Sequence, residues 1–307
     1  MGAARFARGM SQVVDPEEIS IISNVGDDEV IHGLHISPDI DTMIYTLAGA
    51  INPETGWGLK GETWHTMEAL AEYDGITWFR LGDRDLATHL FRTQLLTEGE
   101  SLTEITDKIR KRWKVKPRIL PVTDDSLKTV LYTIVDGEER KLSFQEYFVQ
   151  YAHRPTISRI DYEHLAGLTA TTSVIETLEA AEVIIIAPSN PVLSIAPILA
   201  VPGIAEILAK NRDKVVAISP IIAGEAVKGP AAKLMAELGL GPSALGVANY
   251  YRKLISAIVI DHKDSDLKEQ IELSGMRALE TDTLMRNAPA SMNLAASTLK
   301  LVIRDLN

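Results

Sequence analysis

The feature that most constrains the fold is a series of short apolar runs separated by helical segments in the C-terminal half. The runs are Glu182–Ala187 (EVIIIA), Lys214–Ser219 (KVVAIS) and Ser256–Asp261. Strands that are apolar on both faces are typical of the inside of a parallel sheet, where helices cover both faces. Helical patterns fall between or beside the runs at Ile204–Lys210, Ala231–Leu238 and Ser243–Leu254. This alternation predicts an α/β fold: three-layer, Rossmann-like, with a doubly wound, mostly parallel sheet.

The N-terminal part continues the same pattern. The residues Glu18–Asn24 (EISIISN) are expected to form a short buried strand, and Ser37-Pro38-Asp39 is expected to open a helix over residues 40–50. Further helices are expected at Glu62–Tyr73, Asp83–Glu98 and Leu102–Trp113. Two S-x-x-E capping boxes, Ser101/Glu104 and Ser173/Glu176, mark expected helix starts.

The segment from residue 117 changes character and predicts a smaller inserted α+β lobe. Strands are expected at Arg118–Val122, Thr129–Ile134 and Lys141–Phe148, with Asp136-Gly137 as a hairpin turn. We therefore expect three parts: residues 1–116 and 171–307 form the α/β core, with the nucleotide and acceptor sites in the first, and residues 117–170 form the lobe.

Composition excludes several classes of function. The 307 residues include no cysteine, which excludes disulfides and thiolate metal sites. The formal net charge of −11 disfavours nonspecific nucleic-acid binding, although a small phosphorylated ligand needs only local positive charge or a helix N-terminus. No secretion signal and no apolar run of membrane-spanning length is evident. A soluble, cytoplasmic protein is expected.

Small and polar residues follow the expected strands, where ligands bind in open α/β sheets. The loops are Asn24–Asp28, Pro188-Ser189-Asn190-Pro191, and Ser219-Pro220 with Lys228-Gly229-Pro230 further on. Ser189 and Asn190 can donate to a phosphate or a base edge, and Lys228 precedes a helix N-terminus that suits an anion. The alternative for residues 188–191 is a turn fixed by two prolines.

An acidic cluster comprises Asp27, Asp28, Asp39 and Asp41. Carboxylate oxygens in a region with few histidines suit Mg²⁺ bridging protein to a diphosphate. The alternative is that Asp39 caps a helix and Asp27 stabilises a turn. The histidines lack zinc-site spacing, and His32 and His35 are expected to be solvated or structural.

The octet Gly82–His89 (GDRDLATH) places two carboxylates, an arginine and a histidine at one helix start. Asp83 is expected to cap the helix, and Asp85, His89 and Arg92 share one face at i, i+4 and i+7. This clustering indicates either a ligand site or an ordinary capped helix with a surface network.

Four aromatic residues, Trp57, Trp64, Trp78 and Phe79, crowd the segment before this octet. They would either stack on a planar heterocycle or belong to the core. The sequence has no GxSxG elbow, no P-loop and no complete GxGxxG.

Seven motifs occur in an order that resembles the 2-phospho-L-lactate transferase family, CofD and its bacterial counterpart FbiA. They are NVGDD (24–28), ISPDIDT (36–42), ETGWGLKGETW (54–64), LGDRDLATH (81–89), FQEYFV (144–149), APSNPVLSIAPILAVPGI (187–204) and SPIIAGEAVKGPA (219–231). The opening GAARF resembles the bacterial branch.

The resemblance implies an enzyme of coenzyme F-420 biosynthesis, a phosphotransferase for substituted phosphate groups. It would transfer a phospholactyl or phosphoenolpyruvyl group from a guanosine diphosphate donor to the deazaflavin Fo, with release of GMP. The three-carbon acid stays open among lactate, enolpyruvate and glycerate. The resemblance further implies Mg²⁺, a Rossmann-like core and a homodimer.

The resemblance also implies the site residues. Asp27 and Asp41 would hold Mg²⁺ and position the acceptor hydroxyl, with Asp41 as the base, and Arg84 would orient Fo or neutralise phosphate. Asp83 and Asp85 would fix Arg84 or contact Fo. Guanosine diphosphate would be bound by Ser189, Asn190 and Lys228, with Gly2 and Ala3 as the remainder of a phosphate loop.

The family opens with a strand followed by Gly-Gly-x-Gly, and this chain begins at Met1-Gly2-Ala3-Ala4, inside that loop. We therefore expect reduced nucleotide affinity and stability, because backbone amides of such a loop cradle phosphate.

The alternative function is a YvcK-like regulatory protein that binds nucleotide sugars. That family resembles this chain in the glycine-rich opening and the PSNP-like loop, but it needs no deazaflavin pocket. GDRDLATH and WGLKGETW favour the transferase. A dehydrogenase is disfavoured because the dinucleotide fingerprint is incomplete.

Overall fold

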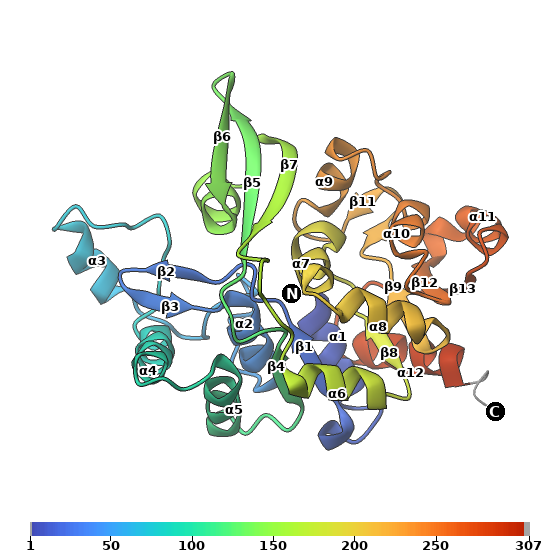
Figure 1. Ribbon diagram of the computed structural model, residues 1–307, viewed down its shortest axis with the longest axis horizontal. Coiled ribbons are helices and arrows are strands. Elements are labelled where there is room, and N and C mark those ends of the chain that lie inside the picture. Colours follow the sequence, from blue (N-terminus) through green and yellow to red (C-terminus); the bar gives the residue numbers. More distant parts are fainter. Residues whose placement is uncertain (1, 304–307) are drawn as a thin grey trace. The chain divides into compact units, whose positions relative to one another are not determined.

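The computed structural model describes residues 2–303, with side chains described up to residue 302 (Figure 1). The chain divides into two compact units. Unit 1 comprises residues 20–168, and unit 2 comprises residues 2–19 together with the chain from Thr169 onward. Both units mix helices with parallel strands, which confirms the predicted α/β class.

Unit 2 is built on a four-stranded parallel sheet with the order β13-β12-β9-β8. Its central strands, β9 (Val215–Ile218) and β12 (Ala257–Asp261), are buried at every position. Their neighbours are β8 (Ile184–Ile186) and β13 (Arg277–Thr281). Apolar runs of this kind fold as inner parallel strands because helices shield both faces. The three predicted strands of this half are therefore confirmed.

The remaining elements of unit 2 are mostly helices. They are α1 (Gly2–Met10), α6 (Thr172–Ala180), α7 (Ala196–Ala200), α8 (Ile204–Lys210), α9 (Ala231–Glu237), α10 (Ala244–Tyr251), α11 (Lys268–Leu273) and α12 (Ala288–Ile303), with short helices at Pro16–Glu18, Pro191–Ile195, Arg212–Lys214 and His262–Leu267, and a two-stranded hairpin of β10 (Ile221–Ile222) and β11 (Glu225–Ala226).

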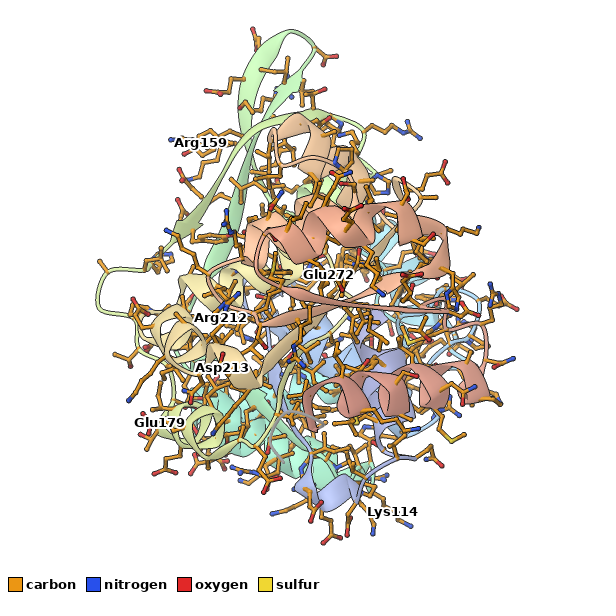
Figure 2. All side chains as sticks on the ribbon, turned by 90° about the vertical axis from the view of Figure 1, so that its right-hand side faces the viewer. Lys114, Arg159, Glu179, Arg212, Asp213 and Glu272 are labelled. Atoms are coloured by element: carbon orange, nitrogen blue, oxygen red, sulfur yellow. The ribbon has the colours of Figure 1, made fainter. Side chains whose placement is uncertain are left out.

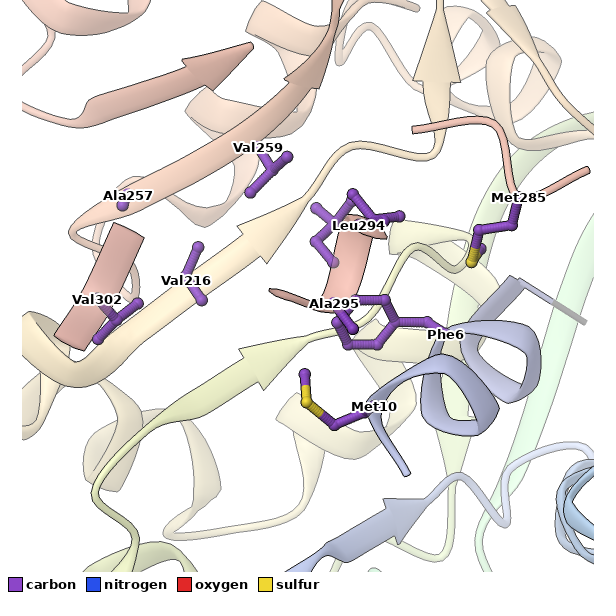
Figure 3. Close-up of a cluster of buried hydrophobic side chains, with 10 residues drawn as sticks. Phe6, Met10, Val216, Ala257, Val259, Met285, Leu294, Ala295 and Val302 are labelled. Carbon is purple, nitrogen blue, oxygen red and sulfur yellow. The ribbon is translucent and has the colours of Figure 1, made fainter. Parts of the chain in front are cut away.

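A buried apolar cluster joins α1 and α12 to this sheet (Figure 3). Phe6 and Met10 of α1 pack with Leu294 and Ala295 of α12 against Val216 and its neighbours on β9 and β12. Gly9 allows the two helices to approach closely, since a Cβ there would lie 2.4 Å from the Ser291 carbonyl oxygen. Helix α1 is therefore an integral part of the core of unit 2.

Unit 1 begins with β1 (Ser20–Ser23), which pairs in parallel with β4 (Arg118–Pro121). Between them in sequence lie the hairpin of β2 (Glu29–Ile31) and β3 (Leu34–Ile36) and the helices α2 (Pro38–Leu47), α3 (His65–Ala71), α4 (Asp85–Thr97) and α5 (Leu102–Arg112). The capping box at the start of α5 is confirmed, since the Ser101 hydroxyl accepts from the Glu104 amide and the Glu104 carboxylate accepts from the Ser101 amide.

The segment predicted as a lobe contains an antiparallel sheet of order β6-β5-β7, formed by Lys128–Val135 (β5), Glu138–Ser143 (β6) and Thr156–Glu163 (β7). Asp136 and Gly137 both have positive φ (53° and 84°), as a two-residue hairpin turn of this type requires. Residues 117–168 belong to the same unit as residues 20–116. The three-part division stays a prediction.

Four local predictions were wrong. The strand expected at Lys141–Phe148 ends at Ser143, and a π-helical turn follows at Glu146–Gln150. Helix α6 is capped by Thr171, not by Ser173, and α2 follows Ser37 at its N-cap position, not Asp39. Helix α4 follows Arg84, so Asp83 does not cap it. At α6 the Thr171 hydroxyl accepts from the Val174 amide, and near α4 the Asp83 carboxylate is engaged by the first amides of α3.

Within the described residues, no single helix is long and apolar enough to cross a membrane; Pro191–Ala200 and Ile204–Lys210 meet that test only as a pair, and they are bent by 94°. Charged side chains such as Lys114, Arg159, Glu179 and Glu272 are exposed (Figure 2).

Candidate active site

The centre of the candidate site in unit 1 is a buried ion pair between two helices. The Arg92 guanidinium of α4 donates to Asp41 Oδ1 of α2, and the side chains are 0% and 6% exposed. Arg92 also donates to the His35 carbonyl of β3 at 3.3 Å. Arg92 therefore ties α4 to both α2 and the β2–β3 hairpin.

The predicted face of α4 is confirmed as a structural cluster, although it is buried and not on the surface. His89 Nε2 lies 3.4 Å from Asp85 Oδ2, and His89 Nδ1 lies 3.3 Å from the Arg92 guanidinium. Tyr45 of α2, one turn after Asp41, donates its hydroxyl to Asp85 Oδ1 at 2.6 Å. Two helices are thus joined by a continuous polar chain.

Charges in this network stabilise one another. Burial alone would lower the pKa of the Arg92 guanidinium, but Asp41 and then Asp28 raise it above its ordinary value. Burial works against ionisation of Asp85, yet hydrogen bonds from His89 and Tyr45 hold its pKa below the usual range. Breaking such a buried pair by removing one partner typically costs about 3–5 kcal/mol.

The loop after β1 carries the second acidic group, Asp27. Burial, followed by the nearby Asp39 carboxylate, raises the pKa of Asp27 well above its usual value. Asn24 donates from Nδ2 to Asp39 Oδ2 at 3.1 Å, and its Oδ1 accepts from the Gly26 amide at 2.8 Å. Burial likewise raises the pKa of Asp28, which is paired with His35 and accepts from the Ser37 hydroxyl.

The acidic residues of this region fit a hard divalent cation. Asp27 Oδ1, Asp28 Oδ1 and Asp41 Oδ2 are buried, and the described residues offer them no hydrogen-bond partner. No group of three or more His, Cys, Asp or Glu side chains among the described residues forms a complete metal site. Magnesium usually takes only one or two protein carboxylates and completes its shell with water and substrate phosphate. Asp27 fits this role best, because Asp41 already pairs with Arg92.

Asp83, which precedes α4, caps α3, and Glu62, which precedes α3, caps α4. Asp83 accepts from the backbone amides of His65 and Thr66, both at 3.0 Å, and so caps α3. Glu62 accepts from the amides of Arg84 and Asp85, both at 2.9 Å, and so caps α4. Hydrogen bonds, first from Thr63, hold the pKa of Asp83 below its usual range. These contacts give Asp83 a structural function at α3. The sequence did not indicate this function, because Asp83 lies next to α4 in the chain.

Arg84 is exposed at the start of α4, and its guanidinium donates to the Lys60 carbonyl at 2.8 Å. Three of the four clustered aromatics, Trp64, Trp78 and Phe79, pack against a buried cluster in unit 1, as core residues do. Trp57 is 48% exposed on the loop before α3.

The residues predicted to bind the nucleotide lie in unit 2. Gly2 and Ala3 form the first turn of α1, where backbone amides lack helical acceptors. Gly2 touches the PSNP loop, since a Cβ there would lie 2.1 Å from the Pro188 carbonyl oxygen. Asn190 accepts from the amides of Val192 and Leu193 and thereby caps the short helix that follows. The structure therefore brings Gly2 together with the loop of Ser189 and Asn190.

Lys228 is exposed on the loop between β11 and α9 of the same unit. Reasoning from the sequence missed Tyr45, Glu62 and Gln145. Tyr45 follows Asp41 by four residues on a helix, so the spacing predicts that the two side chains share one face. Glu62 caps α4 from 22 residues away, and Gln145 donates from Nε2 to the Asp27 carbonyl oxygen from 118 residues away, which no local spacing reveals.

Comparison with known proteins agrees with the motif order. The family model described as 2-phospho-L-lactate transferase CofD matches residues 1–300. Proteins named phosphoenolpyruvate transferase are similar: those of Streptomyces griseus and Mycobacterium marinum are each 39% identical, over 98% of this chain and 95% and 94% of theirs.

A crystal structure of a UPF0052-family protein from Bacillus halodurans has the same fold, with a TM-score of 0.61 and 15% identity over 97% of this chain and 96% of that one. The sequence similarity over nearly the whole chain decides the assignment: the protein is a transferase and belongs to the CofD family of 2-phospho-L-lactate transferases.

Proposed function

We propose that this enzyme transfers a phosphoenolpyruvyl or phospholactyl group from a guanosine diphosphate donor to Fo and releases GMP, as a step of coenzyme F-420 biosynthesis. Family membership supports the transferase class, and the names of the relatives favour the phosphoenolpyruvyl group. The structural observation that supports this most is the buried, unpartnered Asp27 oxygen beside a second carboxylate.

In the proposed reaction, the terminal hydroxyl oxygen of Fo attacks the phosphorus that bears the three-carbon acid. A new P–O bond forms, the P–O bond to GMP breaks, and the hydroxyl proton passes to a carboxylate. Arg92 occupies Asp41 Oδ1, which leaves Asp41 Oδ2 to accept that proton. The ion pair would fix the orientation of the Asp41 carboxylate.

Asp27 would hold Mg²⁺, whereas Asp41, predicted from the sequence as a second ligand, would serve as the base because Arg92 occupies its other oxygen. The neighbouring Asp39 is a further candidate ligand, since it helps to raise the pKa of Asp27. Bound magnesium would offset the negative charge that grows on the phosphate oxygens. Arg84 would orient Fo from the start of α4.

The donor would be bound by unit 2, through the first-turn amides of Gly2 and Ala3 and through Ser189, Asn190 and Lys228. Contact between Gly2 and the PSNP loop supports a joint role for these residues. A homodimer, which the family resemblance implies, and a cytoplasmic location, which the sequence led us to expect, complete the proposal.

The test is a transfer assay with Mg²⁺, Fo and each of three guanosine diphosphate donors, carrying lactate, enolpyruvate or glycerate. Mass spectrometry should detect the coupled product and an equal amount of GMP for at least one donor. The variant Asp27→Asn should give neither. A folded enzyme that produces no coupled product from any donor contradicts the proposal, and a protein that ignores Fo but binds UDP-sugars would support the YvcK-like alternative.

A further inference from the structure

We propose that His89 is a positioning residue for the transfer reaction: it keeps the buried ion pair of Arg92 and Asp41 one-sided and so leaves Asp41 Oδ2 free to accept a proton. This inference rests on the proposed function, in which Asp41 is the base. All the residues involved belong to unit 1, and His89 lies on α4, one turn before Arg92. Only 1% of His89 is exposed, so its ring contacts protein groups and not solvent.

The guanidinium of Arg92 is held at three points. Its Nη2 donates to Asp41 Oδ1, and its Nη1 lies 3.3 Å from the His35 carbonyl oxygen and 3.3 Å from His89 Nδ1. Nη1 carries two hydrogens, so it can donate to both of these atoms at once. His89 therefore supplies the acceptor for one of the two hydrogens and helps to fix the direction of the guanidinium.

This arrangement leaves the ion pair incomplete. Arginine and a carboxylate commonly pair through two parallel hydrogen bonds. Here Arg92 donates to only one oxygen of Asp41. The other oxygen, Asp41 Oδ2, and Arg92 Nε are both buried and find no hydrogen-bond partner among the described residues. Unpaired buried polar groups destabilise a folded protein, so an ion pair with a purely structural role should close on both oxygens.

The ring of His89 is oriented so that it does not itself occupy Asp41 Oδ2. A guanidinium has only N–H groups, so the contact with Arg92 requires Nδ1 to accept, and the ring proton is then on Nε2. Nε2 faces Asp85 Oδ2 at 3.4 Å, and Tyr45 donates to the other oxygen of Asp85 at 2.6 Å. Nδ1 lies 3.8 Å from Asp41 Oδ2 and has no hydrogen to donate to it. Asp85 thus favours the form of the ring that leaves the reactive oxygen free.

The same contacts argue against His89 as a carrier of the proton. A proton that moved from Asp41 to Nδ1 would displace the hydrogen bond from Arg92 and create an imidazolium 3.3 Å from a guanidinium. Like charges at this distance disfavour the charged ring, so the proton taken from the acceptor hydroxyl stays on Asp41. His89 therefore acts through Arg92.

Substitution of His89 tests the inference. In His89→Leu, Nη1 of Arg92 loses an acceptor, and the guanidinium is free to turn and engage both oxygens of Asp41. The kcat should fall about 10- to 100-fold, as a small misplacement of reacting groups causes, while the KM for each substrate stays within about threefold. His89→Asn should recover kcat to within about threefold of wild type, because its amide oxygen can accept from Arg92 in place of Nδ1.

The matched control is Leu95→Ala, which shortens a buried apolar side chain of the same helix. It should lower the Tm but leave kcat, measured well below the Tm, within about twofold of wild type. A folded His89→Leu enzyme with the wild-type kcat would overturn the inference. Equal losses of kcat in Leu95→Ala and His89→Leu would also overturn it, and so would a His89→Asn enzyme as slow as His89→Leu.

Crystal structures of the wild type and of His89→Leu give a second readout that does not depend on turnover. Arg92 should contact one oxygen of Asp41 in the wild type and both oxygens in the variant. A pair of the same geometry in both structures would overturn the inference. An inactive wild type would refute the proposed function, and the two crystal structures would still decide whether His89 keeps the pair one-sided.

Discussion

At the scale of single residues, the buried pair of Asp41 and Arg92 decides which substitutions are informative. Asp41 is the proposed base, but it is also the counter-charge of an arginine that is fully buried. A loss of turnover in an Asp41 variant therefore has two possible causes, lost chemistry and lost stability, and the two must be separated.

We predict that Asp41→Asn lowers the free energy of unfolding by about 3–5 kcal/mol, because it removes the carboxylate to which the buried Arg92 guanidinium donates. The double variant Asp41→Asn/Arg92→Met should recover most of this loss, while turnover stays abolished. Urea unfolding followed by circular dichroism measures both. The control, Lys108→Met, breaks the partly exposed pair with Glu100 and should cost about 0–1 kcal/mol. Equal losses in Asp41→Asn and Lys108→Met would contradict a buried-pair role.

The raised pKa of Asp27 predicts a pH-dependent response to magnesium. In the metal-free enzyme, the folded state holds this proton more tightly than the unfolded chain does, so stability falls as pH rises from the unfolded pKa through the folded one. Magnesium binds the ionised carboxylate and therefore offsets this loss of stability. The increase in Tm caused by Mg²⁺ should therefore be absent at acid pH and should grow as pH rises.

Thermal unfolding from pH 4.5 to 8, with and without Mg²⁺, measures this response. Asp27→Asn should abolish the pH-dependent part. An increase in Tm that is the same at every pH would show that Asp27 does not hold the ion.

At the scale of elements, the caps that Glu62 and Asp83 provide for α4 and α3 join the segment before α3 to the start of α4. Gly82 is required there because an added Cβ would lie 2.2 Å from the Glu62 carboxyl carbon and would displace that side chain. Glu62→Ala and Gly82→Ala should each lower stability by about 1 kcal/mol, since both remove the cap of α4.

The double variant should cost little more than either single variant, because the two act on one contact. Glu98→Ala, at the other end of α4, is the control and should be nearly neutral. Additive losses in the urea-unfolding free energies of Glu62→Ala and Gly82→Ala would contradict the shared mechanism.

Local signals in the sequence predicted most elements but not their long-range partners. The capping box of α5 and the strands of unit 2 could be predicted from short windows of sequence. The spacing of Asp85, His89 and Arg92 correctly predicted one helix face. Asp41 of α2 pairs with Arg92 on that face, but it lies 51 residues away in the sequence. Spacing within α4 does not indicate this partner. The π-helical turn at Glu146 was missed because FQEYFV has apolar residues compatible with a strand.

At the scale of the whole molecule, the predicted ligand residues divide between the two units. Asp27, Asp41 and Arg84 belong to unit 1, whereas Gly2, Ser189 and Lys228 belong to unit 2. The account therefore predicts separate effects on the two substrates. Asp27→Asn should leave the affinity for GDP, measured by calorimetry without Mg²⁺, within about twofold of wild type, because the residues proposed to bind GDP belong to unit 2 and Asp27 belongs to unit 1. A tenfold loss of GDP affinity in this variant would contradict the division.

Motif order across the chain predicted the family, which the comparisons confirm. Motif order did not predict that Asp27 and Phe144, which are 117 residues apart in the sequence, line the same cavity.

The most direct test of the central claim is single-turnover transfer by the Asp27→Asn enzyme with saturating donor, Fo and Mg²⁺. Product formation, quantified with GMP by mass spectrometry, should slow by at least about 100-fold relative to wild type, as expected when charge stabilisation at the reacting phosphate is lost. A folded Asp27→Asn enzyme that forms product at the wild-type rate would contradict the claim that this buried carboxylate carries the reaction.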